Sequence, residues 1–283
     1  MISKGLRWLR GGRSASPLFP EDLAPWRVVG ASVAGTSHQK LRQPCQDAAG
    51  WALGPQRSLI VAVADGAGSA PLGREGAQLA VSTAVEFLSS RRSLSSGDAA
   101  KNHLLSALER ARSALKSDAE TRGVEIRELA TTLILVQATA HHVAALQVGD
   151  GSAVVDDCED GVLGLTKPQT GEYINETMFI TAEDAMDQAE IVFREGRLSG
   201  GAVFSDGLQM LGLKMPEGTP HAPFFKPLLQ FVGAATDAAA ADEELKSFLR
   251  SPRVTGQTTD DLTLVLFSLD PSSVDAGQSS GDG

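Results

Sequence analysis

The chain has 283 residues, 42% of them hydrophobic and 21% charged, which is the composition of a globular protein that can bury a sizeable core. Its formal net charge of -10, with no basic patch, excludes a typical binder of the nucleic-acid backbone. The two cysteines, Cys45 and Cys158, cannot form a disulfide framework or a zinc site, and no apolar run reaches the length of a membrane span. We therefore expect reduced thiols, a cytoplasmic location, and neither nucleic acid nor membrane among the partners.

Composition divides the chain into one domain and two tails. Residues 1–24 are rich in Gly, Ser and Pro and lack an apolar core of signal-peptide length, so a flexible N-terminal tail is expected. Residues 271–283 are rich in Ser, Gly and Asp and are predicted to be disordered. Residues 25–270 show no internal repeat and no break in composition, which predicts one folded domain.

The first half of this domain combines strand and helix patterns. In chain order, the pattern predicts strand 26–33, polar loop 35–47, strands 48–53 and 59–64 as a hairpin, and helices 73–89 and 97–119. Three more segments are predicted to be consecutive strands of one meander: 131–138, 142–148 and 152–156.

The second half begins with a surface excursion at 166–189, whose polar patch Thr170–Thr177 contains the only tyrosine. This patch either shapes access to a site or is a plain surface loop. The elements predicted after it are strands 191–194 and 200–204, helices 208–211, 222–233 and 238–249, and a final strand 262–269. Together the elements predict an α+β fold, in which two antiparallel sheets pack as a sandwich with helices on the outside.

One stretch, residues 59–69, joins an apolar strand to a possible ligand. Six apolar residues end abruptly in Asp65-Gly66, and Gly68 follows two residues later. An isolated Asp-Gly pair is usually an ordinary turn. The same arrangement recurs, however, and carboxylates stand at the ends of five predicted strands: Asp47, Asp65, Asp150, Asp206 and Asp260-Asp261.

Strand ends on one edge of a sandwich can converge in space, and converging carboxylates need a cation to remain ionised together. A cluster of oxygen ligands suits a hard divalent ion such as Mg²⁺ or Mn²⁺. A glycine after the ligand, such as Gly66, leaves its backbone carbonyl free to join the coordination. Two ions that share a bridging carboxylate would generate a nucleophilic hydroxide near neutral pH.

The order of these motifs over residues 28–268 resembles the metal-dependent serine/threonine protein phosphatases of the 2C type, especially the bacterial branch. The motifs that carry the resemblance are Arg42 with Gln46-Asp47, Asp65-Gly66 with Gly68, Gly149-Asp150, Ser205-Asp206-Gly207 and Asp260-Asp261. The resemblance implies a four-layer sandwich flanked by helices, residues 25–270 as the catalytic domain, and a binuclear Mn²⁺ or Mg²⁺ centre at one end.

The resemblance also implies a role for each matching residue. Asp65 would bridge the two metals and Gly66 would lend its carbonyl, while Asp206 and Asp260 would complete the first metal site. Asp47 would hold the second metal largely through water. Asp150, together with Asp206, would bind a looser third ion. Arg42 would clamp the phosphate, for which a planar guanidinium is suited because it can grip two oxygens at once.

The sequence departs from the family pattern at three positions. Gln46 stands where the family often has Glu, and an amide oxygen brings no charge to the second metal. Ala67 stands where eukaryotic members carry a His that serves as a general acid. Asp260-Asp261 replaces the usual Asp-Asn; the ligand is assigned to Asp260 by position, with Asp261 as the alternative. His38 is a weaker candidate for contact with phosphate or metal, against a solvated loop histidine.

The function predicted from these features is hydrolysis of phosphoserine and phosphothreonine by direct attack of a metal-bridging hydroxide, without a phosphoenzyme. The expected partner is a phosphoprotein substrate, either a serine/threonine kinase or a target of one. Two alternatives remain open at this point: a catalytically weak regulatory module that binds a phosphorylated partner, and a Mg²⁺-dependent hydrolase of small phosphoesters.

Overall fold

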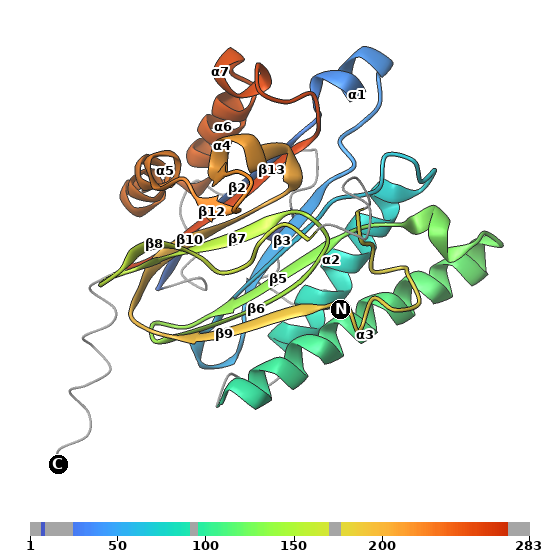
Figure 1. Ribbon diagram of the computed structural model, residues 1–283, viewed down its shortest axis with the longest axis horizontal. Helices are drawn as coiled ribbons and strands as arrows, with labels where there is room; N and C mark the ends of the chain where they lie inside the picture. The colour runs from blue at the N-terminus through green and yellow to red at the C-terminus, as the bar shows by residue number, and fades with distance from the viewer. Residues whose placement is uncertain (1–6, 9–24, 91–95, 170–176, 271–283) are drawn as a thin grey trace.

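Two antiparallel β-sheets pack face to face, and helices cover the outer face of each sheet (Figure 1). The computed structural model describes residues 7–8, 25–90, 96–169 and 177–270. The flexible and disordered tails predicted at 1–24 and 271–283 lie outside these residues, apart from Arg7–Trp8, and stay predictions.

The first sheet has six strands in the order β1-β3-β4-β5-β6-β9, and the second has five in the order β2-β13-β10-β7-β8. The first comprises β1 (Arg7–Trp8), β3 (Ala48–Leu53), β4 (Leu59–Ala64), β5 (Leu133–Ala138), β6 (His142–Val148) and β9 (Glu190–Glu195). The second comprises β2 (Trp26–Val33), β13 (Leu262–Leu269), β10 (Leu198–Phe204), β7 (Ser152–Asp157) and β8 (Gly161–Gly164). A small ribbon of β11 (Leu213–Lys214) and β12 (Thr219–Pro220) stands apart.

The helices divide between the two outer faces (Figure 1). The long helices α2 (Gly73–Ser89) and α3 (Gly97–Arg122) lie on the first sheet. The second sheet is covered by α5 (Ala222–Ala234) and α6 (Ala238–Leu249), with α4 (Gln209–Gly212) and α7 (Pro252–Thr255) beside them. Short 3₁₀ turns complete the chain at Pro55–Arg57, Ile126–Leu129 and Asp206–Leu208. None of the described helices is both long and apolar enough to cross a membrane.

Strand β4 shows why its sequence is apolar without alternation. Ile60, Ala62 and Ala64 pack in the layer under the helices of the first sheet. Leu59, Val61 and Val63 pack in the layer between the two sheets. Because side chains alternate across a strand, a strand covered on both faces needs apolar residues at every position. The strand that leads to Asp65 is therefore fixed from both sides.

The predicted meander of 131–138, 142–148 and 152–156 is wrong in its last step. β6 pairs with β5 and β9, whereas β7 pairs with β10 and β8 in the other sheet. The link Gly149-Asp150-Gly151 crosses from one sheet to the other. Gly149 has φ of +117°, and a Cβ on Gly151 would lie 2.6 Å from the Phe204 carbonyl oxygen. A link of three residues can serve as a hairpin turn or as a crossing, and local sequence does not distinguish the two.

The polar loop predicted at 35–47 contains a short helix, α1 (Thr36–Leu41). Its first turn is held by a contact far away in sequence, because the Ser37 N–H donates to the Thr259 carbonyl at 3.0 Å. The hydrophobic periodicity that reveals larger helices is missing here, since none of the six residues is buried.

The described part of the surface excursion predicted at 166–189 packs against the rest of the domain. Ile180 and Ala185 are fully buried, and Ile180 joins the core under α3. The Arg112 guanidinium of α3 donates to the Ile180 and Ala182 carbonyls. The polar patch at 170–176, with its tyrosine, lies outside the described residues.

Candidate metal centre

The predicted carboxylates gather at one end of the sandwich. Asp65 follows β4, and Asp47 precedes β3, whose Ala48 pairs with Ala64 at the same end of the sheet. Asp150 lies in the crossing between the sheets. In the second sheet, Asp206 follows β10 and Asp260 comes just before β13. The antiparallel pairing of β10 with β13 brings these last two segments together.

Burial and mutual repulsion perturb these acids strongly. Burial, followed by the charges of Asp47 and Asp206, raises the pKa of Asp65 well above its ordinary value. Burial and then the charge of Asp150 raise the pKa of Asp206 to about 6. Burial and then the charge of Asp261 raise the pKa of Asp47 to about 7. The Asp65 and Asp206 carboxyls lie within hydrogen-bonding reach of each other.

Four buried oxygens at this end accept no hydrogen bond from any residue that the structure describes: Gln46 Oε1, Asp47 Oδ1, Asp150 Oδ1 and Asp206 Oδ1. Buried acceptors without donors are rare in folded proteins, and each needs a compensating partner. No three acidic, His or Cys side chains within the described ranges form a ready-made ligand set around one point. The fit to a metal therefore rests on donor chemistry, which is oxygen throughout and suits a hard divalent cation.

Hydroxyl groups fix the backbone and side chains of the ligands. Ser205 Oγ donates to Asp47 Oδ2 at 2.7 Å and accepts from the Thr263 N–H at 3.1 Å, so one serine joins both sheets. The Thr131 hydroxyl donates to the Asp65 carbonyl at 2.8 Å, and the Asp65 N–H donates to Thr132 Oγ1 at 2.9 Å. The roles of Thr131 and Thr132 could not be predicted from the sequence, where only their place at the start of a strand is visible. Ser205, in contrast, is part of the Ser-Asp-Gly motif.

Replacing Ser205 by Ala is expected to weaken Mn²⁺ binding by about 10- to 100-fold, the usual effect of losing a partner that orients a metal ligand. The change frees Asp47 Oδ2 and leaves the Thr263 N–H without its acceptor. Calorimetric titration with Mn²⁺ measures the effect. Ser199→Ala is the matched control, because Ser199 Oγ donates to Asp156 Oδ2 at the same 2.7 Å near the opposite end of β10. Equal affinities in the two variants would contradict the assignment.

Asp150 is held from the excursion that follows the crossing. Thr177 Oγ1 donates to Asp150 Oδ2 at 2.8 Å, while the other carboxylate oxygen has no described donor. The buried Gln147 amide donates to the Gly149 and Gly151 carbonyls, both at 2.9 Å. These bonds fix the crossing between the sheets and leave Asp150 Oδ1 without a described donor.

Asp260 and Asp261 have different surroundings. Asp261 is 2% exposed, and both its oxygens are occupied: Oδ1 accepts from the Gly35 N–H and from His38 Nδ1, and Oδ2 accepts from the Gln46 N–H. Asp260 is exposed, and its Oδ1 accepts from the Asp261 N–H. Asp261 therefore serves the protein's own hydrogen bonds, and Asp260 keeps an oxygen available. His38 contacts Asp261, so it is not a solvated loop histidine.

Arg42 ends α1 in the left-handed conformation, with φ of 58° and ψ of 31°. Its side chain is exposed, and it stands five residues before Asp47 in the chain. A non-glycine residue in this conformation is uncommon, and such outliers concentrate at functional sites.

The two glycines after Asp65, Gly66 and Gly68, differ in how much room a side chain would have. A Cβ on Gly66 would lie 2.4 Å from the backbone of Gly73 at the start of α2, whereas one on Gly68 would meet only Gln46 Oε1, at 4.0 Å. Gly66→Ala is therefore expected to lower the free energy of unfolding by about 1–3 kcal/mol through overpacking. Gly68→Ala is the control and should leave it within about 0.5 kcal/mol. Urea unfolding of both variants in EDTA gives the comparison, and equal losses would refute the packing argument.

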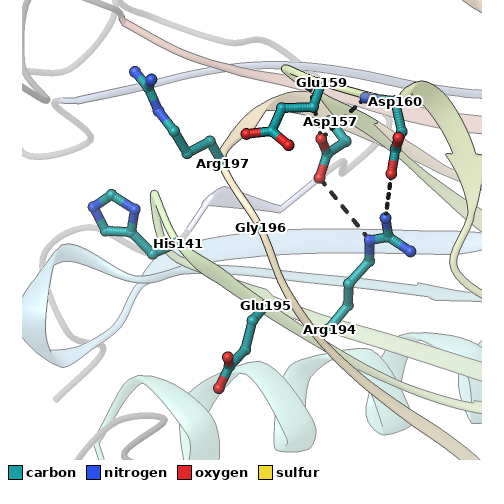
Figure 2. Close-up of a pocket in the computed structure, with 8 residues that line it drawn as sticks. All are labelled: His141, Asp157, Glu159, Asp160, Arg194, Glu195, Gly196 and Arg197. Atoms are coloured by element: carbon teal, nitrogen blue, oxygen red, sulfur yellow. Dashed lines mark hydrogen bonds and ion pairs between the residues drawn. The ribbon is translucent and has the colours of Figure 1, made fainter.

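A hollow with a volume of about 310 Å³ lies at the end of the strands opposite the acidic centre. Figure 2 shows Arg194 reaching toward Asp157 and Asp160, with Arg197 and His141 extending separately from it. The Arg194 Nη2 group donates to Asp160 at 3.0 Å. These residues stand where β7 and β9 end and β10 begins, far along the strands from Asp65, Asp150 and Asp206. This hollow is not part of the acidic centre.

The layered sandwich with acidic strand ends defines the class of the protein, a four-layer α+β sandwich with carboxylates gathered at one end. The particular family follows from sequence: residues 34–250 match the family described as protein phosphatase 2C, and the chain belongs to it. The chain is 40% identical over 249 residues to serine/threonine-protein phosphatase 3 of Escherichia coli K12, covering 85% of this chain and 97% of that protein. The prediction that the protein is a serine/threonine protein phosphatase is confirmed.

Solved structures confirm the predicted fold. The serine/threonine phosphatase Stp1 from Staphylococcus aureus superposes with a TM-score of 0.61 at 15% identity, covering 92% of this chain and 99% of that one. The catalytic domain of the phosphatase PstP, solved in complex with two manganese ions, gives 0.58 at 17% identity, covering 86% and 98%. A structure of the serine/threonine phosphatase PstP/Ppp from Mycobacterium tuberculosis is also similar. These likenesses concern the fold.

Proposed function

We propose that this phosphatase hydrolyses phosphoserine and phosphothreonine in proteins at the acidic end of the sandwich, with two Mn²⁺ or Mg²⁺ ions held there and a third bound more loosely. The observation that carries the proposal is the set of four buried acceptor oxygens without donors in the described structure, on Gln46, Asp47, Asp150 and Asp206. The family membership and the manganese-containing relative support the same reading.

The ligands divide among the ions as follows. Asp65 and the Gly66 carbonyl would serve both tightly bound ions, and Asp206 and Asp260 would complete the first site. Asp47 and Gln46 would serve the second site, and Asp150 with Asp206 would serve the third. When bound, the ions supply a nucleophile by lowering the pKa of a water molecule, and they neutralise charge on the phosphoryl group.

The chain's own groups supply position and rigidity. Asp65 stands on a strand buried on both faces, and Ser205 keeps Asp47 oriented by its hydrogen bond. Arg42 grips two phosphoryl oxygens and places the phosphorus against the acidic end. Ala67, which is buried, cannot donate a proton, so the leaving oxygen takes its proton from water or another group.

Replacing Arg42 by Ala is expected to lower kcat/KM for a phosphothreonine peptide by roughly 10²-fold, because a donor to the charged phosphoryl group is lost. Arg42→Lys should recover only part, since an ammonium cannot grip two oxygens in one plane. Arg57→Ala is a matched control: Arg57 is also exposed, has φ of 57°, and lies at the opposite end in the turn between β3 and β4. Unchanged phosphate recognition in Arg42→Ala would remove Arg42 from the site.

The substrate is proposed to be a serine/threonine kinase or a target of one. A cytoplasmic location is proposed from the two free thiols, since Cys45 and Cys158 form no disulfide. Neither proposal depends on the assignment of the ligands.

One experiment tests the function against its alternatives. The full chain is assayed with p-nitrophenyl phosphate and with a phosphothreonine peptide, in Mn²⁺ and in EDTA. Turnover of the peptide that needs Mn²⁺ is the expected result. Binding of the peptide without turnover would establish the regulatory module, for which the uncharged Gln46 is the supporting observation. Turnover of the small ester alone would establish a small-phosphoester hydrolase.

A further inference from the structure

One buried carboxylate closes the loop that carries Arg42. Asp261 accepts from the Gly35 N–H at 2.7 Å, where the loop leaves β2, and from the Gln46 N–H at 2.6 Å, where the loop returns to β3. A Cβ on Gly35 would lie 2.2 Å from the Asp260 backbone, so the loop also packs tightly against the segment before β13. The residues from Gly35 to Gln46 thus form a ring closed at both ends by Asp261.

His38 connects this closure to Arg42. Its Nδ1 donates to Asp261 Oδ1 at 2.8 Å, with the histidine side chain 16% exposed and the aspartate 3% exposed. On the other side, the His38 carbonyl accepts from the Gln43 N–H at 2.8 Å, and the Arg42 N–H donates to the Gln39 carbonyl at 3.1 Å, with the His38 carbonyl as a second acceptor. The amide groups on both sides of the Arg42 Cα are therefore bonded to the backbone at His38 and Gln39.

The position of Arg42 would be hard to hold without this connection. Helix α1 has six residues, none of them buried, so it gains no stability from packing an apolar face. Its end places Arg42 in the left-handed conformation, which a non-glycine residue adopts only when its surroundings hold it there. The charge-assisted bond from His38 to a buried carboxylate is the strongest fixed point that the described structure provides within the helix.

We propose that His38 and Asp261 form a clasp that positions Arg42 for phosphate binding, so that His38 is a positioning residue of the reaction although it does not touch the phosphate. The inference rests on the proposed role of Arg42. It gives the two carboxylates of Asp260-Asp261 different tasks: Asp261 orients the phosphate clamp, while Asp260 serves the metal.

A double-mutant cycle on the full chain tests the clasp, with wild type, His38→Ala, Arg42→Ala and the double variant assayed in saturating Mn²⁺. The readouts are kcat and KM for a phosphothreonine peptide and the inhibition constant of inorganic phosphate. His38→Ala is expected to raise KM and the phosphate inhibition constant about tenfold, at the lower end of the effect of an outer partner. In the Arg42→Ala background it should add nothing, because there is no arginine left to position.

His38→Asn provides the rescue, because the Asn amide nitrogen occupies the place of Nδ1 and can still donate to Asp261. It should return phosphate inhibition to within about threefold of wild type, and a simple loss of stability would not be repaired in this selective way. His141→Ala is the control histidine, since His141 is exposed at the opposite end of the sandwich.

Two results would overturn the clasp: effects of His38→Ala and Arg42→Ala that multiply in the double variant, or a His38→Ala enzyme that loses Mn²⁺ affinity while phosphate inhibition is unchanged. Failure of the underlying function looks different. A wild-type protein without phosphatase activity would contradict the proposed function. Unchanged phosphate inhibition in Arg42→Ala would contradict the proposed role of Arg42, and the double-mutant cycle would then not bear on His38.

Discussion

Replacing Asp65 by Asn is expected to lower Mn²⁺-dependent turnover of a phosphothreonine peptide by more than about 10²-fold, beyond the loss typical of an outer partner. Asp65 is the carboxylate proposed to serve both ions, and the amide removes its negative charge. The measurement is kcat over a range of Mn²⁺ concentrations, because weakened binding alone would be recovered at high metal.

The same change should leave the metal-free protein folded, and somewhat more stable at neutral pH than the wild type. Burial and the charges of Asp47 and Asp206 disfavour the ionised form of Asp65, so that an uncharged amide of the same shape relieves the repulsion. Thermal unfolding in EDTA checks this. Glu159→Gln, a change at an exposed carboxylate at the opposite end of the sandwich, is the control. Full activity in Asp65→Asn would contradict both the site and the proposed chemistry.

The stability of the metal-free protein is expected to fall as pH rises. Asp47 and Asp206 have an ordinary pKa of 3.8, raised by burial and neighbouring charge to about 7 and about 6 in the folded chain. Between these values the native state holds more protons than the unfolded state, so the free energy of unfolding decreases with rising pH and the loss is complete above the folded values. Thermal unfolding in EDTA from about pH 5 to about pH 8 should show a falling midpoint.

Added Mn²⁺ should reverse this trend, since a cation favours the ionised carboxylates that destabilise the metal-free protein. The stabilisation by Mn²⁺ should therefore grow with pH over the same interval. Asp47→Asn should flatten the slope in EDTA, while the control Glu159→Gln should keep it. A midpoint in EDTA that rises through this interval would show that the acidic centre does not dominate the pH dependence.

The sequence was informative where the signal is local. The boundaries of β4, β6 and β13 follow from runs that are wholly or mainly apolar, and an aspartate stands within two residues of one end of each, where the polar end of the sandwich starts. The assignment of this chain to a sandwich of two sheets needed only the number and spacing of such runs.

Contacts between distant segments could not be predicted in the same way. The crossing at Gly149-Asp150-Gly151 has the length of a hairpin turn, and the choice between the two depends on the partner that each strand finds. Helix α1 has no buried face, and it is held instead by bonds to Thr259 and Asp261, each more than 200 residues away in the chain. The different duties of Asp260 and Asp261 likewise follow from burial, which two identical neighbouring residues do not reveal.

The placement of the ligands on both sheets has a mechanical consequence. Asp65 leaves the first sheet, whereas Asp206 and Asp260 belong to the second, and Asp150 lies on the link between them. A cation bound among them would act as a cross-link between the two sheets at this end of the sandwich. Pulling the sheets apart would then require breaking the coordination, so that metal loading and the resistance of the two layers to separation become one property of the molecule.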